Sequence, residues 1–289
     1  MILRPLAVVF CLVLGPAGLA AQTAPVPQVV EQAGVPDRIA DLSDTLRMAE
    51  VIDVMRQEGL DYGNTLNDEL LGGAGGARWA ETVQRIYDPD VMRQRFEVAL
   101  GQQLAGAEED LTAIQSFFGS AQGQSALKLE VEARRSLLDD ATEEAAKAAW
   151  DDMLARDDAR VEMIRRFATA NDLVESNVMG ALNSNFAFYR GMAESNAFPQ
   201  EMTEEQMLQD VWDQEPDIRR ETEEWLFPFL ALAYQPLPDA DLEAYIAFSE
   251  TAAGKRMNAA LFAAFDAVFV QISHDLGYAA AKQMQGEDI

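Results

Sequence analysis

Residues 241–254 read DLEAYIAFSETAAG, and they align without a gap on residues 110–123, which read DLTAIQSFFGSAQG. Six of the fourteen aligned positions are identical at this offset of 131 residues. The identical pairs are Asp110 and Asp241, Leu111 and Leu242, Ala113 and Ala244, Phe117 and Phe248, Ala121 and Ala252, and Gly123 and Gly254. Self-similarity at one fixed offset is typical of repeated structural units, so the sequence predicts two related helical units.

The shared residues predict a pair of helices joined by a tight corner. We expect the aspartate, Asp110 or Asp241, to cap the first helix, and the leucine and phenylalanine to form its buried face. The hydroxyl residue at the next equivalent position, Ser120 or Thr251, should end the first helix and cap the second. The final glycine removes a side chain where the two helices approach closely. We therefore interpret the motif as a packing motif rather than a catalytic one.

The rest of the chain also carries helical signals. Apolar residues recur at helical spacing over residues 48–55, before Gly59, and a second short apolar face follows over residues 66–71. The last helix bears an apolar stripe of Leu261, Phe262, Phe265, Val268, Phe269 and Ile272. No run of alternating apolar and polar residues predicts a strand. We expect an all-α fold, a multi-helix array or bundle built from two related helical units at residues 41–156 and 157–285, with no sheet.

The N-terminus has the pattern of a secretory signal peptide. Arg4 precedes an apolar run of nine residues, and small residues follow, so we expect residues 1–21 to be removed by cleavage after Ala20 or Ala21. The apolar run is too short to cross a bilayer, which takes about 20 residues. Residues 22–40 contain three prolines and predict a tether. The mature protein is thus expected to be periplasmic or secreted, with no transmembrane span.

The charge and the cysteine content argue against several classes of function. The net charge of −27 and the absence of any block of Lys or Arg argue against binding to nucleic acid. The one cysteine, Cys11, lies within the expected signal peptide. The mature chain would therefore hold no disulfide, thiolate nucleophile or cysteine-based metal site.

Motifs for catalysis and cofactor binding are missing from the sequence. His274 is the only histidine, so a zinc site built from a histidine cluster is excluded. The glycine-rich residues 72–76 follow a helical segment and lack the Lys-Ser/Thr of a phosphate-binding loop, so we interpret them as a flexible connector. Carboxylates are abundant, but no segment matches a calcium loop. We expect no cofactor and no metal, and a site made only of carboxylates stays open.

The most apolar segment after the signal peptide is WLFPFLALAY at residues 225–234. One interpretation is a buried helix at the centre of the second unit, kinked at Pro228. The alternative is a partly open apolar groove lined by Trp225, Phe229 and Tyr234, which would take an apolar ligand or a partner helix.

The segment LALAYQPLPDADLEAYIAFSETAAGKRMNAALFAAFDAVF, residues 230–269, resembles the domain of unknown function 2059 family of exported bacterial proteins. The residues that carry the resemblance are Asp241, Leu242, Phe248, Ser249, Ala252 and Gly254. The copy at residues 110–123 departs from it at Phe118 and Gln122, as a degenerate copy would. The resemblance implies an exported helical protein and implies no activity.

Three functional hypotheses follow. The first is a non-enzymatic module of the cell envelope that binds an envelope protein or an apolar small molecule. The second is a carboxylate-dependent hydrolase acting on cell-wall material, for which acidic side chains would have to face each other across a cleft. The third is a structural protein that associates with itself through its alanine-rich last helix.

Overall fold

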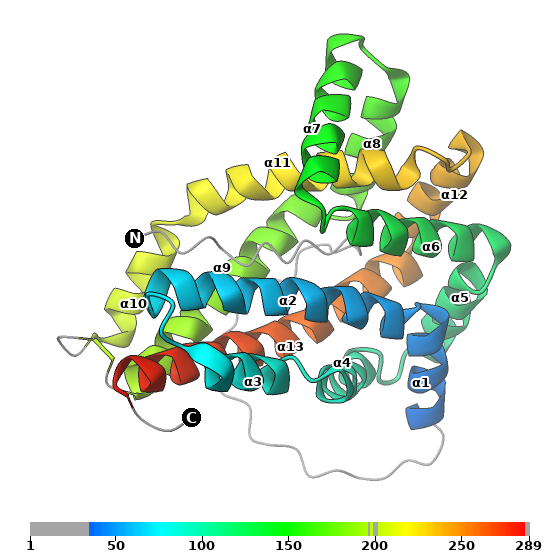
Figure 1. The fold of residues 1–289 in the computed structure, drawn as a ribbon. Helices are drawn as coiled ribbons and strands as arrows, with labels where there is room; N and C mark the ends of the chain where they lie inside the picture. Colours follow the sequence, from blue (N-terminus) through cyan, green and yellow to red (C-terminus); the bar gives the residue numbers. More distant parts are fainter. Residues whose placement is uncertain (1–34, 196, 199–201, 287–289) are drawn as a thin grey trace.

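The computed structural model describes residues 35–195, 197–198 and 202–286. All regular secondary structure among them is α-helical, which confirms the expected all-α class without a sheet (Figure 1). The helices are α1 (Val35–Thr45), α2 (Met48–Leu70), α3 (Gly76–Ile86), α4 (Pro89–Gln103), α5 (Glu108–Phe118), α6 (Ala121–Ser136), α7 (Asp140–Ala155), α8 (Ala159–Ala170), α9 (Leu173–Glu194), α10 (Glu204–Trp212), α11 (Glu215–Tyr234), α12 (Asp239–Ser249) and α13 (Ala252–Met284).

Of the predicted N-terminal segments, only residues 35–40 lie within the described part of the chain. The expected signal peptide, residues 1–21, lies outside the described residues, as does most of the expected tether. The tether was placed too far along the chain, because α1 already begins at Val35 rather than after residue 40. Pro36 stands in the first turn of this helix, where its missing N–H leaves no hydrogen bond unmade.

The longest helix, α13, forms the centre of the fold. It packs mainly against α9 and α4 and also contacts α3, α5 and α12. The apolar stripe supplies the buried residues, with Phe265 and Ile272 almost inaccessible to solvent. Among the described helices, α13 alone is long and apolar enough to cross a membrane, and just over half of its most apolar window is buried within the protein. Its composition is that of a core helix covered by neighbours on several sides.

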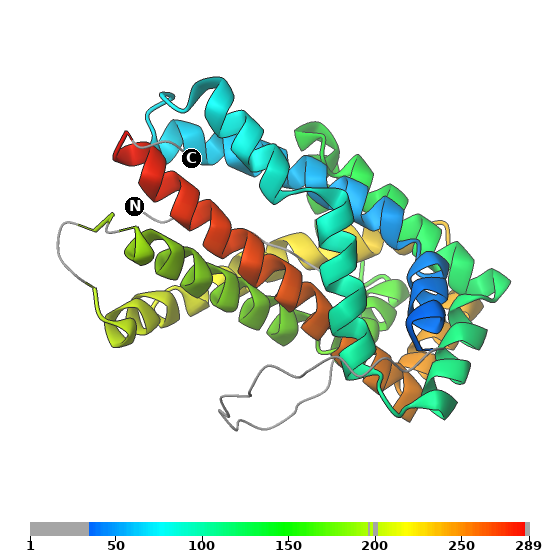
Figure 2. The ribbon, with the colours of Figure 1, turned by 90° about the horizontal axis from the view of Figure 1, so that it is seen from below.

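The pair formed by α9 and α13 is held at very short range by two glycines. The helices run in parallel, side by side (Figure 2), since contacts occur between Asn183 and Asp266 and again between Glu194 and His274. A Cβ atom on Gly191 would lie 2.1 Å from the carbonyl oxygen of His274. A Cβ atom on Gly277 would lie 2.1 Å from the carbonyl oxygen of Phe188. Each backbone therefore occupies the space that a side chain of the other helix would need.

The two apolar stretches before and after Gly59 belong to one helix. Helix α2 continues through Gly59 and Gly63 to Leu70. Both glycines are packing positions: a Cβ on Gly59 would lie 2.2 Å from the ring of Tyr87, and one on Gly63 would lie 2.5 Å from Val83. The ring N–H of Trp79 also donates to the carbonyl of Gly63 at 2.7 Å. Close contact with α3 thus offsets the low helix propensity of glycine.

The glycine-rich segment forms a defined turn between α2 and α3. Gly72, Gly73 and Gly76 have left-handed backbone angles, which a side chain would disfavour. The Gly75 N–H donates to the Asn67 side chain at 2.8 Å, which ties the turn to the end of α2. The segment connects two helices as expected, the flexibility expected of it stays a prediction, and its backbone shape favours glycine.

The two predicted corners have the same local geometry. The Ser120 hydroxyl donates to the Phe117 carbonyl at 2.6 Å and accepts from the Gly123 N–H at 3.1 Å. The Thr251 hydroxyl donates to the Phe248 carbonyl at 2.6 Å and accepts from the Gly254 N–H at 3.0 Å. The hydroxyls therefore end one helix and cap the next, as expected.

The glycines at these corners allow the close approach that we anticipated. A Cβ on Gly123 would lie 2.3 Å from the Phe117 carbonyl oxygen, and one on Gly254 would lie 2.1 Å from the Phe248 carbonyl oxygen. In both corners the obstruction is backbone of the preceding helix, which has no rotamer to change.

The prediction that the aspartates cap their helices is wrong. α5 begins at Glu108 and α12 at Asp239, so Asp110 and Asp241 lie within the first turn, where a carboxylate still favours the helix dipole. Their side chains reach across to the other corner. The Asp110 carboxylate lies 2.7 Å from Nε of Arg256, and the Asp241 carboxylate accepts from the Gln122 amide at 2.8 Å.

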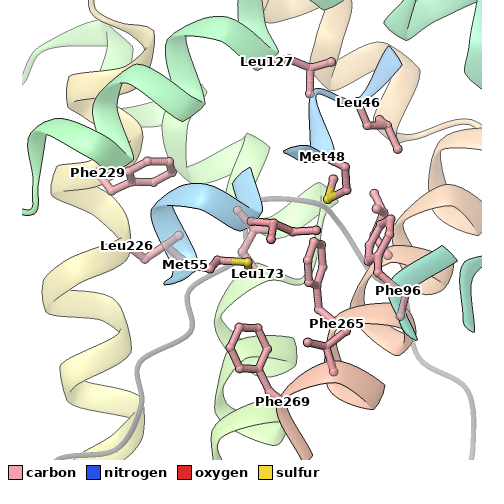
Figure 3. Close-up of a cluster of buried hydrophobic side chains, with 14 of the residues drawn as sticks. Leu46, Met48, Met55, Phe96, Leu127, Leu173, Leu226, Phe229, Phe265 and Phe269 are labelled. Atoms are coloured by element: carbon pink, nitrogen blue, oxygen red, sulfur yellow. The ribbon is translucent and has the colours of Figure 1, made fainter. Parts of the chain in front are cut away.

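One hydrophobic core runs through both expected units. It extends from Ile39 in α1 to Ala281 in α13 without a division near residue 156. Figure 3 shows part of it, where side chains from both units meet: Leu46, Met48, Met55, Phe96, Leu127, Leu173, Leu226, Phe229, Phe265 and Phe269. The rings of Phe96 and Phe265 lie 4.6 Å apart between centroids. The segments assigned to the two expected units are thus packed as a single body around α13.

Candidate functional site

A cavity of about 260 Å³ lies between α7, α8 and α11. Helices α7 and α8 form a hairpin that projects from the rest of the fold over α11 (Figure 1). The apolar part of the cavity lining is Ala146, Ala149, Met153, Ile164, Ala231, Leu232 and Tyr234. The polar part is Asp152, Arg156, Asp158, Arg160 and Gln235. The hairpin is thus positioned to cover an apolar patch on the C-terminal half of α11.

The polar side chains around this cavity are largely engaged in holding the helices. The Arg160 guanidinium donates to the carbonyls of Tyr234, Gln235 and Leu237, at 3.0, 3.2 and 2.9 Å. These carbonyls lie at the C-terminal end of α11, where they lack partners within the helix. The Asp158 carboxylate caps α8 by accepting from the Arg160 N–H at 3.0 Å. The walls left for a ligand are mainly aliphatic.

Tyr234 connects the cavity to a buried carboxyl group. Its hydroxyl donates to Oε1 of Glu130 at 2.7 Å. Glu130 lies on α6 and is only 8% exposed. Burial raises the pKa of Glu130 from 4.5 to about 8, although hydrogen bonds with the Tyr234 and Tyr245 side chains oppose the shift. Glu130 is therefore largely protonated at neutral pH.

This arrangement does not have the layout of a carboxylate hydrolase. Glu130 does not line the cavity, so a ligand there would reach it only through Tyr234. Asp152 and Asp158 lie at the same α7–α8 junction, and Asp158 is committed to its helix cap. Within the described part of the chain, no group of three or more His, Cys, Asp or Glu side chains is placed to hold a metal ion.

The three residues of the predicted groove do not line one surface. Trp225 and Phe229 stack on each other, with ring centroids 4.8 Å apart, and Phe229 is buried in the core. Tyr234 is fully buried and contributes to the cavity, whereas the other two do not. Nine residues separate Trp225 from Tyr234, and at about 100° per residue they stand on opposite sides of the helix. α11 itself is continuous through Pro228, so the proline does not end it.

The motif residues meet at the junction of the two corners. The rings of Phe117 and Phe248 stack in parallel, with centroids 4.1 Å apart and an interplanar angle of 1°. Leu111 and Leu242 are buried in the core, while the two phenylalanines are half-buried. The motif therefore forms a contact between the two expected units, in agreement with its interpretation as packing.

Sequence reasoning missed Glu130 and the role of its partners, although a signal was present. The buried face of α6 consists of Gly123, Ala126, Leu127, Glu130, Val131, Ala133 and Arg134. A glutamate and an arginine therefore fall on the apolar stripe of an amphipathic helix, where they need polar partners. Arg134 finds its partner in Glu58, with N–O distances of 2.8 and 2.7 Å.

Comparison with known proteins adds no relative: no family model, no curated protein and no solved structure matches the chain. The resemblance to the domain of unknown function 2059 family therefore rests on residues 230–269 alone.

Proposed function

We propose that this protein is an exported, non-enzymatic binding module of the bacterial cell envelope, and that the cavity between α7, α8 and α11 takes a small apolar molecule. The cavity is the observation that carries the proposal. Its volume of about 260 Å³ exceeds the roughly 150 Å³ that suffices for benzene in an engineered protein cavity. Export is inferred from the signal-peptide pattern of residues 1–21.

The chemistry of the lining supports an apolar ligand over a charged one. The Arg160 and Asp158 side chains are already hydrogen-bonded to backbone groups at helix ends before a ligand arrives. Besides Asp152, Arg156 and Gln235, the remaining walls are apolar side chains of alanine, leucine, isoleucine, methionine and tyrosine. Methionine adapts readily to ligands of different shape. The α7–α8 hairpin supplies the wall of the cavity opposite α11.

A substitution at the mouth of the cavity tests this function. Ala149 is exposed and lines the cavity, so Ala149→Phe should fill the entrance without disturbing the core. Ala148 is the adjacent exposed residue and does not line it, so Ala148→Phe is the matched control. We expect the uncharged fluorophore N-phenyl-1-naphthylamine to bind the mature protein saturably. Ala149→Phe should weaken this binding by about tenfold, a loss of about 1.4 kcal/mol, and Ala148→Phe should leave it unchanged.

Two results would contradict the proposal. One is the absence of saturable binding to the folded mature protein. The other is an equal effect of the two phenylalanine variants, which would place the fluorophore elsewhere on the surface.

A further inference from the structure

A second cavity, of about 350 Å³, lies between α3, α4 and the C-terminal part of α13. These helices lie on the side of the molecule opposite the α7–α8 hairpin (Figure 1). Three cationic side chains line the cavity, Arg85 from α3, Arg95 from α4 and Lys282 from α13, together with one carboxylate, Asp275. Cationic side chains therefore outnumber carboxylates in the lining of this cavity, in a protein of net charge −27.

The two arginines differ from most others in the protein. Arg93, which is close to Arg95 on α4, contacts both Asp44 and Glu97 at 2.7 Å. Across the described residues, neither Arg85 nor Arg95 has a carboxylate partner within ion-pair distance. Arg85 donates only to the Thr82 hydroxyl, at 2.8 Å. Both arginines line the same cavity. Because neither has an acidic partner in a chain with so many carboxylates, both are available to bind an external anion.

The carboxylate in the cavity is held by its own helix. Oδ1 of Asp275 accepts from the Gln271 amide at 2.8 Å and lies 3.2 Å from Nδ1 of His274. These contacts partly satisfy Asp275 and direct it toward residues of α13. The exposed ring of Tyr278 and the exposed side chain of Val91 give the cavity an apolar rim.

We propose that this second cavity binds a small organic phosphate, with the phosphate between Arg85, Arg95 and Lys282 and its apolar group against Tyr278 and Val91. A phosphate monoester carries a charge of about −1.5 to −2 at neutral pH, which suits a site with two arginines that have no carboxylate partner. Arginine forks form paired hydrogen bonds with phosphate oxygens. The remaining negative charges of the protein act weakly at this site, because salt screens exposed charges over about 8 Å. The inference is independent of the apolar cavity proposed above.

The phosphate could belong to a free molecule or to the headgroup of a lipid. We assign it to a free molecule, because a small phosphate approaches only the cavity, whereas an anionic bilayer would also face the surrounding surface of a protein with a net charge of −27. Three probes separate the cases: phenyl phosphate, inorganic phosphate, and phosphatidylcholine vesicles that contain phosphatidic acid. Calorimetric titration measures the first two, and co-sedimentation measures the third.

We expect phenyl phosphate to bind saturably with one site per chain, more tightly than inorganic phosphate, and we expect no binding to the vesicles. Arg85→Gln and Arg95→Gln should each weaken phenyl phosphate binding by about tenfold, equivalent to about 1.4 kcal/mol. Arg165 is an exposed arginine of α8 outside the cavity, so Arg165→Gln removes the same charge and should change the affinity by less than about twofold.

The assignment fails if phenyl phosphate does not bind, or if Arg165→Gln weakens it as much as the cavity variants do. If inorganic phosphate bound as tightly as phenyl phosphate, the proposed contact of the ligand's apolar group with Tyr278 and Val91 would be wrong. Binding to vesicles that is lost in Arg95→Gln would overturn the assignment to a free ligand. Circular dichroism of each variant verifies that the loss is not a loss of folding.

Discussion

At the scale of single residues, Glu130 places an ionisable group where its neighbours on α6 are apolar. Leaving a carboxylate there without compensation would cost several kcal/mol, so the protein keeps the group protonated and bonds it to the Tyr234 hydroxyl. Arg134, on the same helix, instead pairs with a carboxylate and donates two hydrogen bonds to Glu58. Both solutions make the interior of this helix dependent on specific partners rather than on packing alone.

The raised pKa of Glu130 predicts a pH-dependent stability. The pKa is 4.5 in the unfolded chain and about 8 in the folded protein, so unfolding releases a proton between these values. The stabilisation is full below pH 4.5 and is lost as the pH rises to about 8, at about 1.4 kcal/mol for each pH unit at most. Glu130→Gln keeps the shape and removes the titration, so it should be more stable than the wild type at pH 9.

Urea unfolding of the variant and the wild type at pH 5 and pH 9 measures this difference. Glu132→Gln, at an exposed position on the same helix, is the control and should leave the difference between the two pH values as it is in the wild type. If Glu130→Gln shows the same loss of stability between pH 5 and pH 9 as the wild type, another group is responsible for it.

At the scale of helices, glycines decide how closely α9 and α13 pack. An alanine at position 191 would bring its Cβ atom to 2.1 Å from the His274 carbonyl and 2.7 Å from the Tyr278 N–H nitrogen. Both atoms are backbone, so the helices would have to separate. We expect Gly191→Ala to lower the free energy of unfolding by at least about 1–3 kcal/mol, the usual cost of overpacking.

Gly180 lies on the same helix, and a Cβ atom there would meet nothing within 4 Å. Gly180→Ala should therefore raise the free energy of unfolding by about 0.5–1 kcal/mol, because alanine has the higher helix propensity. Chemical denaturation of both variants provides the comparison. Similar effects of the two substitutions would mean that the glycine contact between α9 and α13 is not tight.

The helix corners were predictable from the sequence because their signals are local. Ser120 and Thr251 cap helices through atoms only three residues away, and this spacing is visible in the chain. The packing role of Gly59 could not be predicted, because it depends on contact with the Tyr87 ring, which lies beyond the end of α3. Asp110 was misplaced for the same reason, since its partner Arg256 is distant in sequence.

The apolar cavity was only partly predictable. Tyr234 was identified from the apolar segment of α11, but the opposite wall comes from α7 and α8, whose placement follows from tertiary packing. The grouping of Tyr234 with Trp225 also ignored the helical angle between them. The second cavity joins α3, α4 and α13, and no local pattern links these three segments.

At the scale of the whole molecule, the presence of two related units stays a prediction, and the order of helices supports it. α2 packs on α3, α4 and α6, as α9 packs on α10, α11 and α13. The corners before α2 and α9 each contain a residue with left-handed backbone angles, Arg47 and Asp172. One aligned pair has diverged: Phe96 is buried against Phe265, whereas Phe227, at the offset of 131, stacks on Trp150.

The central claim is that one core, built around α13, holds both units together. Helix α4 from the first unit and α9 from the second both pack on α13. If this is correct, neither unit keeps its structure when the other unfolds.

Native-state hydrogen exchange of the mature protein at increasing urea concentrations, followed by mass spectrometry, tests this claim most directly. We predict that peptides from α4, α9 and α13 open with the same free energy and the same dependence on urea. Opening of α4 at markedly lower free energy, while α9 and α13 stay protected, would show two separate cores and contradict the account.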